Sequence, residues 1–339
     1  MKTRLISFLF LCPFLAVATL ASTGCARAVS RPDELVVYAY DSFTSEWGPG
    51  PELSRLFAER TGVKLTLISC GDAAQVLSRA VLEKKRPAAD VLVGIDNNLA
   101  DAARRSGVLE AYRSPRHEVV PDELVLDEDW LLTPYDWGYF ALIHDSASGV
   151  PAPASLEDLT RPEYAKRLIL MDPRTSTPGL GFVAWTVAVY GDDYISYWER
   201  LKPSVLTLAP GWDSGYGLFT SGEAPLVISY TTSPAYHAEY DNTDRYKALV
   251  FPEGHPRQIE GLGVVKGCAN RPGARAFVDF MLTDEAQAVL PLTQWMYPVS
   301  RTVPLPASYA AAPLAGKAVE ANHDRVAAAV DAVLDALSR

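Results

Sequence analysis

Short apolar runs alternate with amphipathic stretches from residue 34 to about residue 300. The runs are continuous and rich in Val, Ile, Leu and aromatic residues, which is typical of strands buried on both faces. Between them, apolar residues recur three and four positions apart, as on one face of a helix. We expect strands at residues 34–40, 64–69, 89–94, 167–171, 226–230, 247–251 and 261–266, and helices at 51–61, 72–84, 179–190, 192–201, 233–240 and 273–282. This alternation predicts an α/β fold with largely parallel sheets.

Extended segments near residues 132–144 and 247–265 suggest that the chain crosses twice between two lobes. We therefore assign residues 34–140 and 255–300 to lobe I and residues 141–254 to lobe II. Ligand sites in such folds lie beyond the carboxyl ends of strands and between domains, which places a cleft between the lobes. Apolar residues at helical spacing predict a packing helix within residues 301–339, on a lobe that the pattern does not specify.

The composition agrees with two domains and narrows the function. The chain has 339 residues, of which 48% are hydrophobic, enough for two cores without disulfides or metals. Its net charge of -10 argues against nucleic acid, which requires a basic surface. Cys70 and Cys268 could pair in an oxidising compartment, and the sequence leaves this open. Neither lies in a cluster with zinc spacing, so we expect no metal and no other cofactor.

The N-terminus has the pattern of an export signal. Lys2 and Arg4 precede an apolar run over residues 5–20, which is short for a membrane span and is followed by small residues and Cys25. We expect a signal peptide at residues 1–24, lipidation of Cys25 and a tether at 25–33. Ordinary secretion with an incidental Cys25 is the alternative. Either way, we expect the mature protein outside the cytoplasm.

Aromatic, glycine, proline and hydroxyl residues concentrate just after several predicted strands, at residues 40–51, 70–73, 172–181 and 229–236. Flat rings with polar edges suit a planar heteroaromatic cation, through stacking and cation–π attraction. The candidate rings are Tyr40, Trp47, Trp212, Tyr230, Tyr236 and Trp295. Each ring taken alone also fits a core position, so the hypothesis depends on their common location at one cleft.

Helix starts in the same segments suit an anion. Asp72-Ala73 and Ser176 stand where strands give way to helices, so free backbone N–H groups and the helix dipole are available there. The hydroxyl of Ser176 adds a donor. Asp72 and Ser176 also fit the simpler role of helix caps. A ligand with an aromatic cation at one end and a phosphate at the other would use both features.

At these segments the sequence closely resembles the thiamine-binding periplasmic proteins of bacterial ABC importers. The matching stretches are VVYAYDSFTSEWGPGP, VLVGIDNNL, PYDWGYFAL, MDPRTSTPGLG, GWDSGYGLF, ISYTTSPAYH and WMYPV. They run in order from about residue 35 to 300, so the resemblance covers most of the mature chain. It implies a two-lobed type II periplasmic-binding-protein fold that closes around thiamine, thiamine monophosphate or thiamine diphosphate. It also implies an importer permease as partner, and we expect a monomer that meets the membrane only through its lipid.

The resemblance also implies roles for single residues. Tyr40, Trp47, Tyr236 and Trp295 would frame the aminopyrimidine and thiazolium rings. The phosphate end would meet Asp72, Ala73, Ser176, Trp212 and Tyr230. The chain departs from the family pattern at Ala73, where a glycine is expected, and the extra methyl group could crowd a phosphate. Trp137 replaces a commoner tyrosine, a change that fits hinge packing.

Other functions on the same architecture remain as alternatives. Ferric-binding relatives use adjacent tyrosines with acidic and histidine ligands, whereas Tyr230 and Tyr236 are six residues apart without such a cluster. Polyamine binders need several carboxylates along the cleft, and the strand-end segments are poor in them. Thiaminases share the two lobes and use a cysteine nucleophile, for which Cys70 is the candidate. Asp72, two residues later, would oppose the thiolate that such a reaction needs.

Overall fold

The computed structural model describes residues 32–338. The expected signal peptide, Cys25 and most of the expected tether lie outside this range. Among the described residues, no helix combines the length and apolar character required to cross a membrane.

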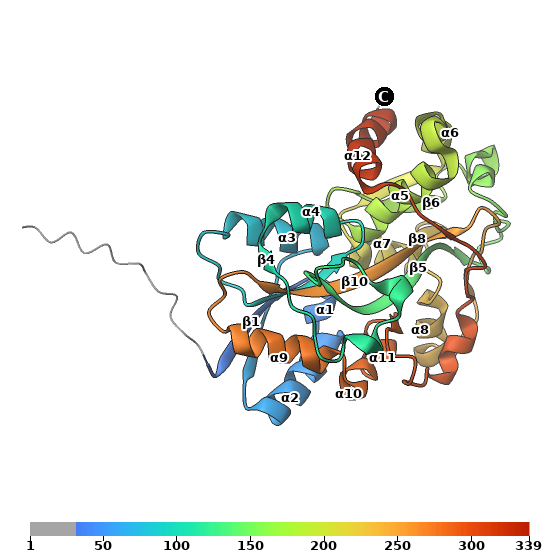
Figure 1. Cartoon of the computed structure of the whole chain (residues 1–339). Helices are drawn as coiled ribbons and strands as arrows, with labels where there is room; N and C mark the ends of the chain where they lie inside the picture. The colour runs from blue at the N-terminus through green and yellow to red at the C-terminus, as the bar shows by residue number, and fades with distance from the viewer. Residues whose placement is uncertain (1–31, 339) are drawn as a thin grey trace, which may run out of the picture.

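A single bent sheet runs through the molecule (Figure 1). Its strand order is β2 (Lys64–Ser69), β1 (Glu34–Ala39), β3 (Val91–Asp96), β10 (His255–Val265), β5 (Thr133–Asp145), β8 (Leu226–Tyr230), β6 (Leu168–Met171) and β7 (Val205–Ala209). Short strands β4 (Leu109–Glu110), β9 (Tyr246–Ala248), β11 (Tyr297–Pro298) and β12 (Ala318–Val319) pair at its margins. Neighbours are parallel among β1, β2 and β3 and among β6, β7 and β8. The central strands β5 and β10 are antiparallel to each other and to β8 and β3, whereas the short β12 pairs with β10 in parallel.

The helices are distributed over both parts of the sheet, and the longest are α12 with 16 residues and α5 with 14. They are α1 (Asp41–Thr44), α2 (Pro49–Thr61), α3 (Ala73–Leu82), α4 (Ala100–Ser106), α5 (Thr177–Tyr190), α6 (Tyr194–Leu201), α7 (Trp212–Thr220), α8 (Ser233–Tyr240), α9 (Arg271–Met281), α10 (Asp284–Gln287), α11 (Leu290–Thr293) and α12 (His323–Ser338). Strand β7 and helix α7 have no counterpart among the predicted elements. The strand predicted at 261–266 is the end of the much longer β10.

The first part of the sheet, formed by β1, β2 and β3, has helices on both faces. The side chains of β1 show why two covers are needed. Leu35 and Val37 pack with Phe57 of α2 and Phe277 of α9, whereas Val36 packs with α3 and α4 on the other face. Successive strand residues point to opposite faces, so a continuous apolar run requires a cover on both sides. Figure 1 shows α2 and α9 on one face and α3 and α4 on the other.

The second part of the sheet has its own core around α5, α6 and α12. Trp185 of α5 is fully buried, and its Nε1 donates to the carbonyl of Gly254 at 2.8 Å. Val326 and Val333 of α12 belong to the same core, so the C-terminal helix, expected without a defined location, packs on α5 and α6 (Figure 1). The lobe boundaries near residues 140 and 255 remain a prediction.

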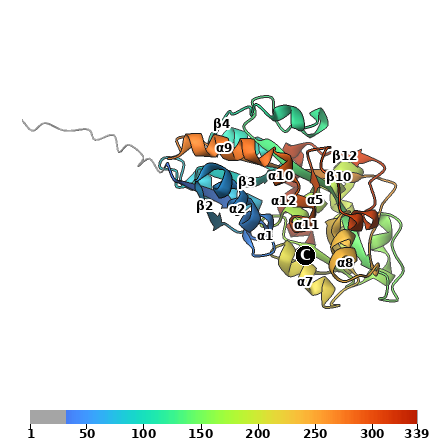
Figure 2. The same cartoon turned by 90° about the horizontal axis from the view of Figure 1, so that it is seen from below.

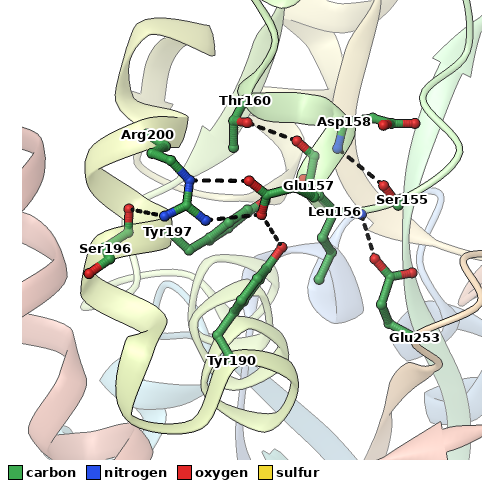
Figure 3. Close-up of polar contacts among 10 residues, drawn as sticks. All are labelled: Ser155, Leu156, Glu157, Asp158, Thr160, Tyr190, Ser196, Tyr197, Arg200 and Glu253. Carbon is green, nitrogen blue, oxygen red and sulfur yellow. Dashed lines mark hydrogen bonds and ion pairs between the residues drawn. The ribbon is translucent and has the colours of Figure 1, made fainter.

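Polar side chains beside this second core form hydrogen bonds with one another (Figure 3). Glu157 accepts hydrogen bonds from Arg200, at 3.0 and 3.1 Å, and from the Tyr190 hydroxyl at 3.1 Å. The backbone N–H of Leu156 donates to Glu253 at 2.9 Å. These contacts hold the short 3-10 helix η3 (Glu157–Thr160) against α6. Because the ion pair is largely exposed, its contribution is at most about 1 kcal/mol.

Candidate ligand-binding site

The strand-end segments of the two parts of the sheet meet each other beside β5 and β10. Trp47, after α1, contacts Trp212 of α7, and Figure 2 shows α1 beside α7. Tyr236 of α8 contacts Trp295, which follows α11. Asp72, before α3, bonds to Thr177 at the start of α5. Residues that are far apart in sequence therefore meet at one place, and we call this place, marked by Trp47, Trp212, Asp72, Thr177, Tyr236 and Trp295, the convergence.

The exposed Tyr236 ring and the half-buried Trp295 ring form an aromatic pair. Their centroids lie 5.3 Å apart at an interplanar angle of 86°, and Tyr236 is 40% exposed. Tyr240 contacts both rings and is 62% exposed. The backbone of Trp295 has φ = 59°, in the left-handed region that bulky residues rarely adopt. Such strain is often found at binding sites, where surrounding structure holds it.

A second aromatic group lies on the other side of the convergence. Trp47 is 51% exposed, and its ring centroid is 6.4 Å from that of Trp212. Trp212 is fixed from behind, because it stacks on Tyr216 at 5.0 Å and its Nε1 donates to Ser229 Oγ at 2.8 Å. The exposed Trp47 ring thus contacts a ring whose orientation is held by its neighbours.

Asp72 has two roles in this structure. Its carboxylate accepts from the Ala73 amide at 2.7 Å, in a capping box that begins α3. It also accepts from the Thr177 amide at 3.1 Å and the Thr177 hydroxyl at 2.9 Å. The amides expected to hold an anion therefore already hold the protein's own carboxylate. Burial raises the pKa of Asp72, against the opposing effect of these hydrogen bonds.

Nearby hydroxyl groups have no partner. Ser176 precedes α5 as its cap residue but makes no side-chain capping bond, unlike the cap role considered for it. The hydroxyls of Ser176, Thr231 and Thr232 are buried and have no hydrogen-bond partner within residues 32–338. Buried polar groups are nearly always paired, so donors without partners at two adjacent strand ends are consistent with a ligand that pairs with them.

Tyr40 lies deeper than the other predicted rings. It is buried, and its hydroxyl donates to Glu260 at 2.8 Å and lies 3.2 Å from the Tyr135 hydroxyl. Burial holds the pKa of Tyr40 and of Tyr135 well above the ordinary tyrosine value. Gly94 makes room for Tyr40, because a Cβ at its φ of 91° would lie 2.1 Å from the ring. Tyr40 can therefore shape the floor of a site, under the exposed rings.

Tyr230 also belongs to this floor. Its ring stacks on Phe140 of β5, with centroids 5.2 Å apart, and burial holds the pKa of its hydroxyl well above the ordinary value. Trp137, on the other face of β5, packs on Tyr297 with ring centroids 5.0 Å apart, and its role in hinge packing stays a prediction. A cavity of about 460 Å³ opens beside Trp137, Tyr139 and Arg257, on the face of β5 opposite to Phe140 and Tyr230.

The structure thus brings the predicted residues into a few contacting groups, without testing which of them bind a ligand. Residues that the sequence reasoning missed also belong to the convergence: Tyr135, Asp136, Thr177, Tyr240, Glu260 and Gln294. Tyr240 had a usable signal, since it follows Tyr236 by one helical turn. Cys70 and Cys268 are free thiols. No group of side chains suited to a metal ion occurs in the described part of the chain.

Two α/β parts joined by central antiparallel strands, with exposed rings and unpaired hydroxyls where their strand ends meet, define a two-lobed solute-binding protein. The family described as "Bacterial extracellular solute-binding protein" matches residues 86–319. The chain belongs to this family and has its type II periplasmic-binding-protein fold.

Two relatives of this chain are named as thiamine-binding periplasmic proteins. The chain is 42% identical to a "Thiamine-binding periplasmic protein" of Brucella abortus biovar 1, over 88% of this chain and 89% of the relative. It is 39% identical to the protein of the same name from Escherichia coli K12, over 84% and 86% of the two chains.

Solved structures agree with these relatives. One described as "Periplasmic thiamin binding protein" matches with a TM-score of 0.83 and 37% identity, over 90% of this chain and 96% of that chain. A ferric binding protein from Campylobacter jejuni has a TM-score of 0.75 at 17% identity, over 90% and 98%, and supports the fold alone.

Proposed function

We propose that this protein captures thiamine or its phosphate esters outside the cytoplasm and delivers them to an ABC-type importer. The observation that carries the proposal is the partly exposed Tyr236–Trp295 pair, in which the backbone of Trp295 is left-handed. Such rings suit a flat heteroaromatic cation. The names of the relatives at 42% and 39% identity support thiamine as that cation.

The proposal includes location and partners. The mature protein acts in the periplasm as a monomer, attached through Cys25, and its partner is the importer permease. The relatives' names support the periplasm. The lipid attachment rests on the small residues before Cys25 alone.

The protein acts without a catalytic step and without a cofactor. A thiaminase-like role for Cys70 would need a stabilised thiolate. Burial raises the pKa of Cys70, and its thiol donates a hydrogen bond to the carbonyl of Ile68 at 3.5 Å. Cys70 packs beside Ile68 against a core, as a structural cysteine does.

Binding requires a change of shape. Tyr236 and Trp295 touch edge to face with centroids 5.3 Å apart, but a ring between two parallel rings needs roughly 7 Å. The two parts of the molecule must therefore open to admit the ligand and close on it.

Calorimetric titration with thiamine, thiamine monophosphate, thiamine diphosphate and spermidine tests the proposal. We expect saturable binding of at least one thiamine compound, with quenched tryptophan emission, because indole rings would stack on the ligand. Small-angle scattering should report a more compact protein in the complex. Binding of spermidine alone, or of none of these compounds, would refute the function.

Replacing Ser176 with alanine tests the phosphate end. We expect the affinity for thiamine monophosphate to fall by about 0.5–1.5 kcal/mol, because a buried hydroxyl without a partner would lose its bond to phosphate. Free thiamine should be affected less. Ser54→Ala is the control, because that hydroxyl already donates to Gly50 at 2.7 Å within α2. Equal losses for both ligands would argue against the assignment.

A further inference from the structure

Two carboxyl groups lie side by side in the centre of the sheet, outside the predicted site residues. Asp136 of β5 and Glu260 of β10 are directly opposite each other on antiparallel strands. Opposite residues in such a pair present their side chains on the same face. Asp136 is 0% exposed and Glu260 is 5% exposed, so both carboxyls are buried.

That face of the sheet is the one toward the candidate site. Gly138 stands two residues after Asp136 on β5, and a Cβ there would lie 2.9 Å from the Met296 methyl group and 4.0 Å from the Tyr230 ring. Gln294, next to Trp295, donates to Glu260 at 3.2 Å, as Tyr40 does at 2.8 Å. The carboxyls therefore lie directly under the residues that line the convergence.

The position of Tyr135 agrees with this arrangement. The register of β5 and β10 shifts between Glu260 and Gly261, so Tyr135 is an extra residue opposite this step. Its hydroxyl reaches Glu260 at 3.0 Å. Bulges of this kind often re-aim side chains next to binding sites.

The carboxyl pair has no positive partner. Within residues 32–338, no arginine, lysine or histidine forms an ion pair with either group. Glu260 receives only neutral donors, and neither oxygen of Asp136 has any hydrogen-bond partner. The Oε1 atom of Gln258, buried beside Glu260, is also without a partner. A buried carboxylate is costly unless a charge or donors compensate it, so this floor lacks a compensating group.

We propose that Asp136 and Glu260 form a cation-binding floor, which shares one proton when the site is empty and releases it when the positive ring of the ligand arrives. The proposal rests on the proposed function and names the residues that receive the thiazolium charge. The proton passes to solvent, the pair changes from one negative charge to two, and the ligand supplies one positive charge.

The electrostatic surroundings agree with proton sharing. Burial, followed by the repulsion between the two groups, raises the pKa of Asp136, and burial raises the pKa of Glu260. The other ionisable groups that act on the pair are acidic side chains and tyrosines: Asp72, Asp96, Tyr40, Tyr135, Tyr230 and Tyr309. Two adjacent carboxyls in such surroundings cannot both ionise without an incoming cation.

The sign of the pH dependence follows. The cation binds the ionised pair, so affinity rises with pH while a proton is being released. The slope is at most about tenfold per pH unit for one proton, and we expect about tenfold between about pH 6 and about pH 8. The quaternary nitrogen of thiazolium keeps its charge over this range, so the ligand does not cause the change.

Calorimetric titration of thiamine in buffers of different ionisation enthalpy measures the released protons. For the wild-type protein we expect release of up to about one proton per thiamine near pH 7. In Asp136→Asn the second carboxyl is gone and Glu260 keeps its four neutral hydrogen-bond donors, so the proton release and its pH dependence should fall clearly below the wild-type values. Affinity at about pH 8 should fall about tenfold. Glu260→Gln should also weaken thiamine binding at about pH 8, because the pair again loses one of its negative charges.

Asp145→Asn is the matched control. Asp145 lies on the same strand and is also buried, but Arg245 pairs with it at 2.6 Å. This variant should retain wild-type proton release and affinity. Failure of the wild type to bind thiamine and both of its phosphate esters would refute the proposed function. Thiamine binding without proton release between about pH 6 and about pH 8 would refute the carboxyl pair alone, as would unchanged release in Asp136→Asn.

Discussion

Replacing Trp295 with alanine is expected to weaken thiamine binding by about 1–3 kcal/mol, a loss of roughly five- to 150-fold. The indole offers a wide π face to a cationic ring, and the contact strengthens as closure removes water. Tyr236→Ala should give a loss in the same range, because its ring forms the other side of the pair. Calorimetric titration of both variants measures the effect.

The backbone at Trp295 permits a sharper test of the ring itself. Alanine at φ = 59° keeps the strain of the left-handed conformation, whereas glycine adopts it freely. If ring contact is the main term, Trp295→Ala and Trp295→Gly should lose similar affinity, and Trp295→Phe should retain part of it. Tyr194→Ala is the control, since Tyr194 packs on the α5–α6 core. Unchanged affinity in both Trp295→Ala and Tyr236→Ala would contradict the stacking role.

The general architecture could be predicted because it follows from local patterns. Alternating strands and helices specify α/β layers, and the rule that ligands gather beyond strand ends directed attention to Tyr236, Trp295 and Ser176. The contact between Tyr236 and Trp295 agrees with that reasoning. The missed α7 has apolar residues interrupted by glycines, at Gly215 and Gly217, so its helical period is weak in sequence.

The floor of the site could not be predicted, because it depends on pairing between distant segments. Asp136 and Glu260 become neighbours only through the register of β5 against β10. The sequence around each shows a single carboxylate, which normally indicates an exposed residue. The second role of Asp72 has the same origin, since its capping of α3 is local but its bond to Thr177 depends on the two parts meeting.

Replacing Asp72 with asparagine is expected to increase the affinity for thiamine monophosphate relative to thiamine by about ten- to a hundredfold. The carboxylate of Asp72 accepts from the amide and hydroxyl of Thr177, at the helix start where a phosphate would bind. A phosphate must therefore displace or tolerate a negative charge at close range. Asparagine keeps one oxygen for capping, removes that charge and adds an N–H donor.

The variant Asp213→Asn distinguishes the effect of the direct contact made by Asp72 from the effect of negative charge in general. Asp213 lies in the first turn of α7, and repulsion from Asp41 and Asp72 contributes to its raised pKa, after the larger effect of burial. It belongs to the same acidic surroundings, so its neutralisation should also favour a phosphate, but only by about threefold because it does not bond to the α5 start. Titrations of both variants with thiamine and thiamine monophosphate give the two ratios. Similar ratios would mean that Asp72 acts through general charge, and an unchanged ratio in Asp72→Asn would mean that phosphate binds elsewhere.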